Sequence, residues 1–392
     1  MCSHEAFYGI GEEFFSRGDC VHTSKEIAHQ PKLWNCLARE LAGRSAEISS
    51  FMKKIGDISQ VRIIFTGAGS SAFVGDALSV LIAKYAGVRT ESIHTTDIVT
   101  SPGSHLFADI PTLIISFARS GNSPESVGAI KYARTAIKDL FEIAIVCDDT
   151  SNLYHLTRES DKSMILVMPE GSNDNGFAMT SSVSCMLLAG YALFNLDRVE
   201  DLLADIALIS EHIKDHSLEL TEAASKWAGR DFDRIVYLGC GFLKHVAHEA
   251  SLKMMELTNG AVSGSFDSAT GFRHGFKSVI KDNTLTVHMI SDDPFTARYD
   301  VDLLKEVCNQ QKQNIVIAIC GNDAGDVPGD GVIRIPSGGF AGCGELFTGL
   351  QMLVFCQMLA MFKSLSLGVT TDDPSPSGAV NRVVKGVIIY DY

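Results

Sequence analysis

The chain contains the same strand-like pattern twice, and this repetition constrains its fold more than any other feature. The run RIIFTGAG at 62–69 is matched in the second half by RIVYLGCG at 234–241. The run IAIVCDD at 143–149 is matched at nearly the same offset by VIAICGND at 316–323. Self-similarity over this distance indicates a duplicated structural unit.

Apolar runs rich in Ile and Val recur in both halves with helical stretches between them. Short runs without alternation are typical of strands buried on both faces of a parallel sheet. We therefore predict an α/β fold with one parallel sheet in each half. The predicted strands are 62–69, 112–121, 142–149, 163–170, 234–241, 284–293, 314–323 and 331–336.

The strand pattern also suggests where the domains begin and end. We expect a helical segment at 1–43, a first domain at 44–205, a second at 218–368 and a tail at 369–392. Helices should bridge the two domains around 195–228. The alternating apolar residues near the end of the tail indicate that it docks on the protein.

Composition excludes several classes of protein. The formal net charge is −14 and no Lys/Arg run occurs, so we expect no nucleic-acid partner. No apolar stretch approaches the about 18–20 residues of a membrane span, and the N-terminus does not resemble a secretory signal. The ten cysteines form no CxxC pair, which favours reduced thiols and a cytoplasmic location. An N-terminal cysteine such as Cys2 can be a glutaminase nucleophile, but that chemistry needs a whole domain before the first α/β unit. Here that unit begins by residue 61, so we expect Cys2 to have no such role.

Two loops rich in Ser and Gly follow predicted strands of the first half and open helices. They read TGAGSSAFVGD at 66–76 and SFARSGNSPES at 116–126. Ligands of open α/β sheets bind beyond the carboxyl ends of strands, where hydroxyls and helix amides can donate to an anion. The first loop partly matches a dinucleotide fingerprint, but Glu91 and Asp97 are ambiguous as its acidic partner. A dinucleotide site would also leave the second loop without a role. The sequence lacks a GxxxxGK[ST] P-loop, so two such loops favour a phosphate monoester.

The segment EASLKMMEL at 249–257 places three charges on or near one face of a predicted helix. These are Glu249, Lys253 and Glu256. By itself the pattern fits a surface helix with an i,i+4 ion pair. Together with the serine loops, His274 and Lys385, it favours proton-transfer chemistry. His245 and His248 have i,i+3 spacing but no evident third ligand, so we expect no metal site.

The serine loops, EASLKMMEL, GFRHGFKS and the terminal NRVVKG together resemble the SIS (sugar isomerase) family over essentially the whole chain. The greatest likeness is to the galactosamine-6-phosphate deaminase/isomerases, also called tagatose-6-phosphate ketose/aldose isomerases. AHQPKLW, GFAMTSS and PSPSGAVNRVVKGVII resemble that subgroup. The resemblance implies tandem SIS domains, each a three-layer α/β/α sandwich of flavodoxin-like type.

The resemblance also implies a role for individual residues. Glu256 would move a proton between C1 and C2 of a sugar 6-phosphate, with Glu249 and Lys253 as its upstream partners. His274 would open the sugar ring in the neighbouring subunit's site, which implies a homodimer or a higher oligomer. Lys385, in the tail, would reach the hydroxyl end of the substrate. The residues expected to bind the phosphate are Ser70, Ser71, Arg119 through its amide, Ser120, Asn122 and Ser123.

The chain departs from the family pattern at one position, because the family usually has His-Gly-Pro and here Phe276 follows His274 and Gly275. This puts in doubt the rigidity of the loop that we expect over 264–278, though not the role of the imidazole. The chemistry needs neither a metal nor an organic cofactor. On an amino sugar it yields deamination, whereas ammonia transfer from glutamine is unsupported because a glutaminase domain is absent.

Three functions remain open at this point. They are deamination of galactosamine 6-phosphate, plain ketose/aldose isomerisation and non-catalytic sensing of a sugar phosphate. The first two need the same proton shuttle, so the residues cannot separate them, and no residue identifies the sugar epimer. Glu256, His274 and Lys385, with the lack of a helix-turn-helix segment, argue against a sensor.

Overall fold

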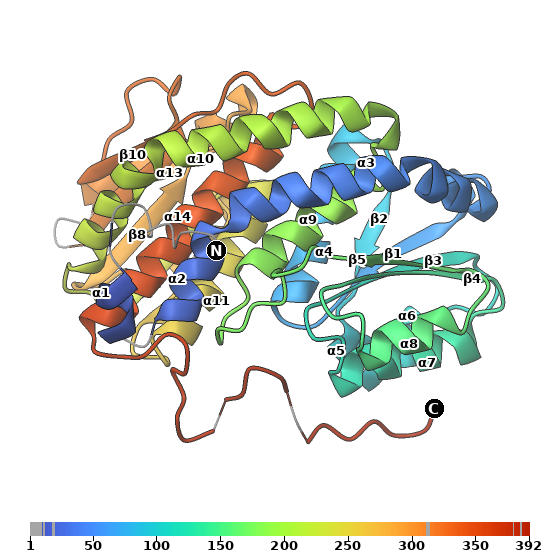
Figure 1. Cartoon of the computed structure of the whole chain (residues 1–392). Helices are drawn as coiled ribbons and strands as arrows, with labels where there is room; N and C mark the ends of the chain where they lie inside the picture. Colours follow the sequence, from blue (N-terminus) through green and yellow to red (C-terminus); the bar gives the residue numbers. More distant parts are fainter. Residues whose placement is uncertain (1–9, 11, 18–19, 311–313, 379, 385) are drawn as a thin grey trace. The chain divides into compact units, whose positions relative to one another are not determined.

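The structure of the chain is a computed structural model that describes all residues except 1–9, 11, 18–19, 311–313, 379 and 385 (Figure 1). It divides into two compact units, each assembled from separate stretches of sequence. The first-sheet unit comprises Lys32–Asp174, Ser181–Leu203 and Ser377–Tyr392. The second-sheet unit comprises the described residues up to Pro31, Asn175–Thr180 and Ala204–Pro376.

The first-sheet unit is built on five parallel strands in the order β2-β1-β3-β4-β5. With the strands numbered along the chain, this order is 2-1-3-4-5, which is the order of flavodoxin-like folds. All residues of β3 and β4 are buried, as expected for strands covered on both faces. The strands are β1 Arg62–Thr66, β2 Thr90–Ser92, β3 Thr112–Ala118, β4 Leu140–Val146 and β5 Ser163–Val167.

Helices cover both faces of this sheet (Figure 1). One face packs against α3 Gln30–Ile55, α4 Ser70–Tyr85 and α9 Ser181–Ala192. The other face packs against α5 Thr95–Thr100, α6 Pro102–His105, α7 Pro124–Ala136 and α8 Asn152–Arg158. Two short 3-10 helices, η1 Ile58–Gln60 and η2 Leu196–Arg198, complete the unit.

The second sheet repeats the first. Its order is β10-β9-β8-β6-β7, which is again 2-1-3-4-5 when its strands are numbered along the chain. All of its strand pairs are parallel. The expected duplication, parallel sheets and α/β/α layers are therefore confirmed. The strands are β6 Arg234–Leu238, β7 Ser263–Asp267, β8 Thr284–Met289, β9 Ile315–Gly321 and β10 Gly331–Ile335.

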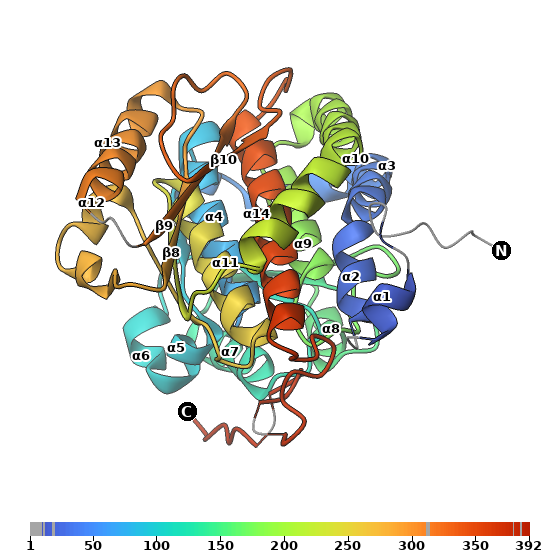
Figure 2. The same ribbon diagram turned by 90° about the vertical axis from the view of Figure 1, so that its left-hand side faces the viewer.

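Helices cover this sheet on both faces too (Figure 2). α11 Phe242–Leu257 and α14 Gly344–Ser366 lie on one face, and α12 Ala269–Phe272 and α13 Pro294–Gln310 lie on the other. The remaining helices are α1 Glu12–Arg17, α2 Val21–Ala28, η3 Phe276–Val279 and α10 Val199–Ala228, which belongs to this unit from Ala204 onward.

Helix α14 corrects one expectation from the sequence. Among the described residues it is long and apolar enough to cross a membrane by length and composition alone. Its most apolar window is, however, completely buried within the protein. Such burial is typical of a core helix of an α/β domain, since a helix that is apolar all round must be covered.

The expectation of a loop over 264–278 is also wrong. The segment begins inside strand β7, which pairs with β6, and continues through α12 into η3. Strand β7 is poor in apolar residues, so its sequence gave no strand signal. A Cβ on Gly264 would lie 2.5 Å from the carbonyl oxygen of Ser251, so glycine lets α11 pack directly on this strand. Strand β2 was likewise not predicted.

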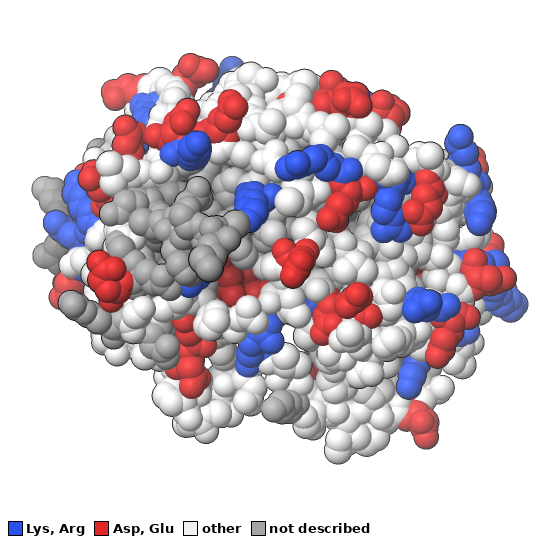
Figure 3. Space-filling model, in the orientation of Figure 1, with Lys and Arg blue, Asp and Glu red and all other residues white. Residues whose placement is uncertain are grey.

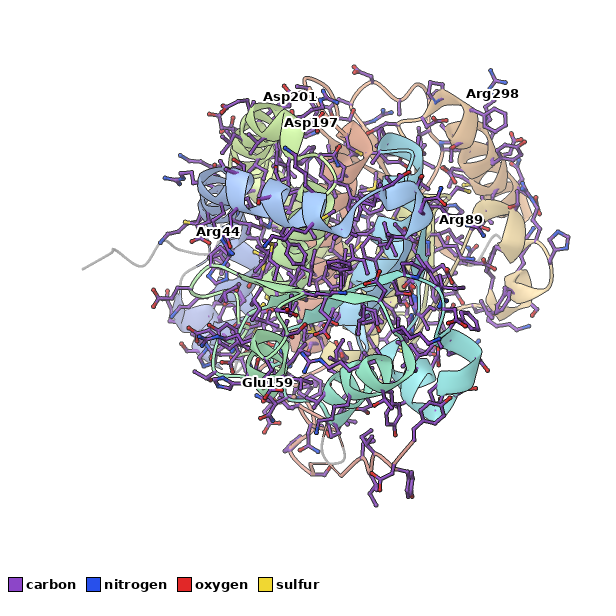
Figure 4. The ribbon with its side chains drawn as sticks, turned by 90° about the vertical axis from the view of Figure 1, so that its right-hand side faces the viewer. Arg44, Arg89, Glu159, Asp197, Asp201 and Arg298 are labelled. Atoms are coloured by element: carbon purple, nitrogen blue, oxygen red, sulfur yellow. The ribbon has the colours of Figure 1, made fainter. Side chains whose placement is uncertain are left out.

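Charged side chains of both signs alternate over the face shown in Figure 3. Several form exposed ion pairs in the first-sheet unit, and Figure 4 labels Arg44, Glu159 and Asp201 at its surface. Arg44 lies 2.8 Å from Glu47 and Arg198 lies 2.7 Å from Asp201. Exposed pairs of this kind contribute at most about 1 kcal/mol each. The cysteines of the described residues are all free thiols, as expected.

Candidate functional site

The first serine loop joins β1 to α4 by a turn that only glycine allows. Gly69 has a φ of +56°, and a Cβ on Gly67 would lie 2.6 Å from the backbone of Ser71. The loop therefore closes tightly, and α4 begins at Ser70. Ser70 and Ser71 lie buried in the first turn of this helix, at the carboxyl end of a parallel strand. Anions are favoured at such a position by the helix amides and the helix dipole.

The second serine loop has the same relation to β3 and α7. In the sheet, Thr66 at the end of β1 pairs with Ser116 near the end of β3, so the two loops leave adjacent strands. Helix α7 starts with proline directly after Ser123, whose hydroxyl hydrogen-bonds that of Ser126 at 2.7 Å. Gly121 has a φ of +59° and provides the sharp turn between strand and helix.

Within this second loop, the predicted phosphate ligands differ in what they contact. The hydroxyl of Ser120 lies 3.4 Å from the amide of Asn122. The side-chain oxygen of Asn122 accepts a hydrogen bond from the amide of Asn152 at 3.0 Å, so it ties two loops together. The guanidinium of Arg119 is buried and donates to the carbonyl of Arg382 at 2.6 Å. The guanidinium of Arg119 therefore contacts the tail, and the role that we expect for its backbone amide stays a prediction. Phosphate binding by these loops stays a prediction.

The three charges of α11 form a buried cluster. The ammonium of Lys253 lies 2.5 Å from Glu256 Oε2 and 3.3 Å from Glu249 Oε1. The side chain of Lys253 is fully buried and that of Glu249 nearly so, whereas Glu256 is 26% exposed. The alternative of a surface ion pair is therefore wrong. Only Glu256 of the three reaches solvent, so it is the one that could contact a substrate.

The two carboxylates decide the charge state of the lysine. Burial alone would lower the pKa of Lys253, but Coulombic attraction to Glu249 and Glu256 and hydrogen bonds to both outweigh it and raise that pKa. The lysine is therefore a cation at neutral pH. Nearby on the same helix, the ring of His248 stacks on Phe266 with centroids 3.8 Å apart. Among the described residues, no group of three or more His, Cys, Asp or Glu side chains is placed to hold a metal ion.

His274 lies far from this cluster within the second-sheet unit. It follows α12, on the face covered by α13, whereas Glu256 belongs to α11 on the opposite face (Figure 2). Helix α11 starts after the carboxyl end of β6, so Glu256, one residue before its end, lies toward the amino ends of the strands. His274 instead follows the carboxyl end of β7 by only a few residues. Within this unit, the structure does not bring His274 to Glu256.

The turn at His274, between α12 and η3, is exposed but held to the body of its unit. The side chain of His274 is exposed, and its amide donates to the carbonyl of Gly271 at 2.9 Å. On either side, Arg273 and Lys277 both pair with Glu306 of α13, the first at 2.7 Å. These two ion pairs constrain the turn at which Phe276 stands in place of the family's proline.

Lys385 lies outside the described residues, but the tail around it contains contacts that the sequence did not reveal. Arg382 donates from Nε to the carbonyl oxygen of Asp174 at 2.9 Å. The buried carboxylate of Asp174 in turn accepts hydrogen bonds from the amides and hydroxyls of Ser181 and Ser182 at the start of α9. No local motif marks Asp174 and Arg382, because they are far apart in the sequence.

The SIS domain family matches residues 58–196 and 230–362, which covers more than half of the chain. The chain belongs to the SIS domain family. The D-galactosamine-6-phosphate deaminase AgaS of Escherichia coli is 38% identical over 372 residues, which cover 94% of this chain and 96% of that protein. The relatedness therefore spans both SIS domains.

Two solved structures agree over nearly the whole chain. The crystal structure of tagatose-6-phosphate ketose/aldose isomerase from Escherichia coli has a TM-score of 0.85 and 34% identity, and the match covers 95% of this chain and 96% of that one. A Clostridium novyi NT protein, proposed to be a tagatose-6-phosphate ketose/aldose isomerase, has a TM-score of 0.93 and 39% identity. That match covers 99% of this chain and 100% of the other.

The two SIS domains share a backbone but not the chemistry of their loops. Gly241, after β6, has a φ of +58°, close to that of Gly69. The residues that follow Gly241 are the buried Phe242 and Leu243 instead of two serines. After β8 the loop carries Asp292, whose pKa is raised by burial, with nearby carboxylates adding to the effect. The serine hydroxyls that we predict to bind a phosphate therefore have no counterpart at the start of α11.

Proposed function

We propose that the protein is a D-galactosamine-6-phosphate deaminase/isomerase, which converts D-galactosamine 6-phosphate to D-tagatose 6-phosphate and ammonia. The observation that supports it most is the buried Glu249–Lys253–Glu256 cluster, in which Glu256 alone reaches solvent. It occurs in a chain 38% identical over 94% of its length to a protein named for that activity. The enzyme would act in the cytoplasm, in the breakdown of amino sugars such as N-acetylgalactosamine.

The reaction needs one group that can move a proton between adjacent carbons. In the proposal, His274 transfers a proton between O1 and O5 and opens the ring to the aldehyde. Glu256 then removes the C2 proton, which leaves an enolamine, and returns a proton to C1. The product of that step is an iminium at C2. Water adds to the iminium carbon, the nitrogen leaves as ammonia, and the ketose phosphate remains.

Lys253 and Glu249 would prepare Glu256 for this task. A buried cation 2.5 Å from Glu256 Oε2 holds that carboxylate in one orientation. Glu249, on the other side of the lysine, balances its charge in the protein interior, since a buried unpaired ammonium would be costly. The proton shuttle is thus supported by groups that need not touch the sugar.

We place phosphate binding and proton transfer in different SIS domains. The hydroxyls and amides of the two serine loops, within 44–205, would hold the 6-phosphate, and the groups within 218–368 would act on C1 and C2. Lys385 of the tail would reach the hydroxyl end of the sugar. Because His274 and Glu256 lie on opposite faces of one sheet, we further propose a homodimer in which His274 completes the partner's site.

Turnover of three sugar phosphates tests the proposal. The purified protein is incubated with the 6-phosphates of galactosamine, glucosamine and tagatose, and ammonia and ketose phosphate are measured. We expect ammonia from galactosamine 6-phosphate in equal amount to ketose phosphate, and none with the Glu256→Gln variant. No ammonia from either amino sugar would refute the deaminase.

The same experiment examines a second candidate, a plain ketose/aldose isomerase. Its supporting observation is the 34% identity to a solved tagatose-6-phosphate ketose/aldose isomerase. This candidate predicts interconversion of tagatose 6-phosphate with its aldose and no ammonia from the amino sugars.

A further inference from the structure

The C-terminal tail is fixed to the first-sheet unit at two separate points. The first is Arg382, whose carbonyl accepts the hydrogen bond from Arg119 at 2.6 Å. The guanidinium of Arg382 donates to the carbonyl of Asp174 and, at 3.2 Å, to the side-chain oxygen of Asn173. Backbone and side chain of one residue are thus held by two different loops.

The second point lies at the end of the chain, on helix α7. Ile389 packs against the apolar cluster under this helix. A Cβ on Gly128 would lie 3.0 Å from Ile389 Cγ2, so the glycine leaves room for the tail to cross the helix. The hydroxyl of Tyr132 donates to the carbonyl of Tyr390, and its ring lies 5.4 Å from that of Tyr392. Figure 1 shows the tail passing this side of the unit.

The contacts of the tail alternate along its length. Ile388 is 69% exposed and Tyr390 is 75% exposed, whereas Ile389 between them is partly buried against the unit. An extended chain places successive side chains on opposite sides, so alternate residues face the protein. Ile388 therefore provides a matched control for Ile389, with the same side chain one position away.

Both points connect the tail to elements that form the serine loops. Arg119 is the first residue after β3, within the second loop, and α7 is the helix that this loop opens. In the sequence, Lys385 stands three residues after Arg382 and four before Ile389. Lys385 is therefore bracketed in the sequence by the two points of attachment.

We propose that Arg382 and Ile389 are positioning residues that hold the tail in register on the phosphate-binding unit, so that Lys385 is presented to the substrate. Arg119 serves both parts of this arrangement, since its amide belongs to the predicted phosphate loop and its guanidinium holds the tail. The inference deepens the proposed function and rests on it for the role of Lys385.

The test compares Ile389→Ala and Arg382→Ala with the control Ile388→Ala. Misplacement of a catalytic group by about 1 Å can cost about 100-fold in rate. We expect kcat to fall about 10- to 100-fold in the first two variants, with KM within about threefold. The control should stay within about twofold of wild type. Hydrogen exchange of the backbone amides of 380–392 should be faster in the first two variants only.

A double variant shows whether these residues act through the lysine. If Ile389 only positions Lys385, then Ile389→Ala adds nothing to the loss of kcat in Lys385→Ala. Additive losses would overturn the proposal, as would an Ile389→Ala variant that behaves like Ile388→Ala. A thermal unfolding scan identifies any variant that fails to fold. If Ile389→Ala does not fold, the same comparison is made with Arg382→Ala, alone and combined with Lys385→Ala.

Failure of the proposed function can be distinguished from failure of this inference. If the wild-type protein turns over none of the sugar phosphates, the proposed function is refuted. The comparison of hydrogen exchange at 380–392 then tests the attachment of the tail by itself. Equal exchange of the tail in all variants would refute the two-point attachment, whatever the enzyme catalyses.

Discussion

Replacing Lys253 by methionine removes a buried charge and nearly preserves the length of the side chain. In the folded protein this leaves the carboxylate of Glu249, only 2% exposed, without the cation that lies 3.3 Å from it. Removing one partner of a buried ion pair typically costs about 3–5 kcal/mol, because the other charge stays buried without the attraction of its partner. The free energy of unfolding of a whole domain is about 5–15 kcal/mol, so the loss should be large.

Chemical denaturation, followed by circular dichroism, measures this loss. The matched control is Lys244→Met on the same helix, where the lysine is 39% exposed and lies 3.4 Å from Asp267. Asp267 is largely buried, but its carboxylate keeps the hydrogen bond from the amide of Ser268 at 2.7 Å, and Lys244 itself is partly exposed. The control should therefore lose much less stability than Lys253→Met. Adding Glu249→Gln to Lys253→Met should restore part of the lost stability, since the double variant buries an amide in place of a carboxylate.

The pH dependence follows from the same charges. In the wild type the pKa of Lys253 is raised, so its contribution to stability is complete at neutral pH and is lost only as pH rises through that raised pKa, above about 10.4. In Lys253→Met the pKa of Glu249 should rise because the cation 3.3 Å from it is gone, and the stability deficit should shrink as pH falls through that pKa. A deficit below about 1 kcal/mol, or one that does not diminish in acid, would refute the argument.

Three further predictions concern activity. Ser71→Ala or Ser120→Ala should raise KM more than it lowers kcat, because the phosphate is bound equally in the ground and transition states. An unchanged KM in steady-state assays would mean that the serine loops are ordinary turns. Glu256→Gln should lower kcat at least about 100-fold and abolish exchange of the C2 proton with deuterated solvent, followed by NMR; retained exchange would assign the base elsewhere. Mixing inactive Glu256→Gln and His274→Ala proteins should restore activity once subunits exchange, because half of the sites in mixed dimers regain both groups. Continued inactivity with demonstrated exchange would place both groups in one subunit.

Much of the fold is encoded in short stretches of sequence. The Ile- and Val-rich runs formed strands where they were predicted, because residues buried on both faces must be apolar at every position. The strands end a few residues before those runs, since their last residues form the loops. The loop after β1 was also predicted from its Ser and Gly residues, and in the structure Gly69 adopts a positive φ that few other residues tolerate; Gly241 does the same after β6. Repetition of these local signals was sufficient to predict two similar parallel sheets.

Other features depended on partners distant in the sequence. The spacing of Glu249, Lys253 and Glu256 fits an exposed helix as well as a buried one, and only packing of α11 against β7 and α14 determined that the lysine is buried. Strand β7 has too few apolar residues to be recognised alone, and it exists because β6 supplies its hydrogen bonds. The contact of Arg382 with Asp174 links segments that no local rule connects. Local propensity is set by neighbours along the chain, whereas burial, charge pairing and the attachment of the tail are set by neighbours in space.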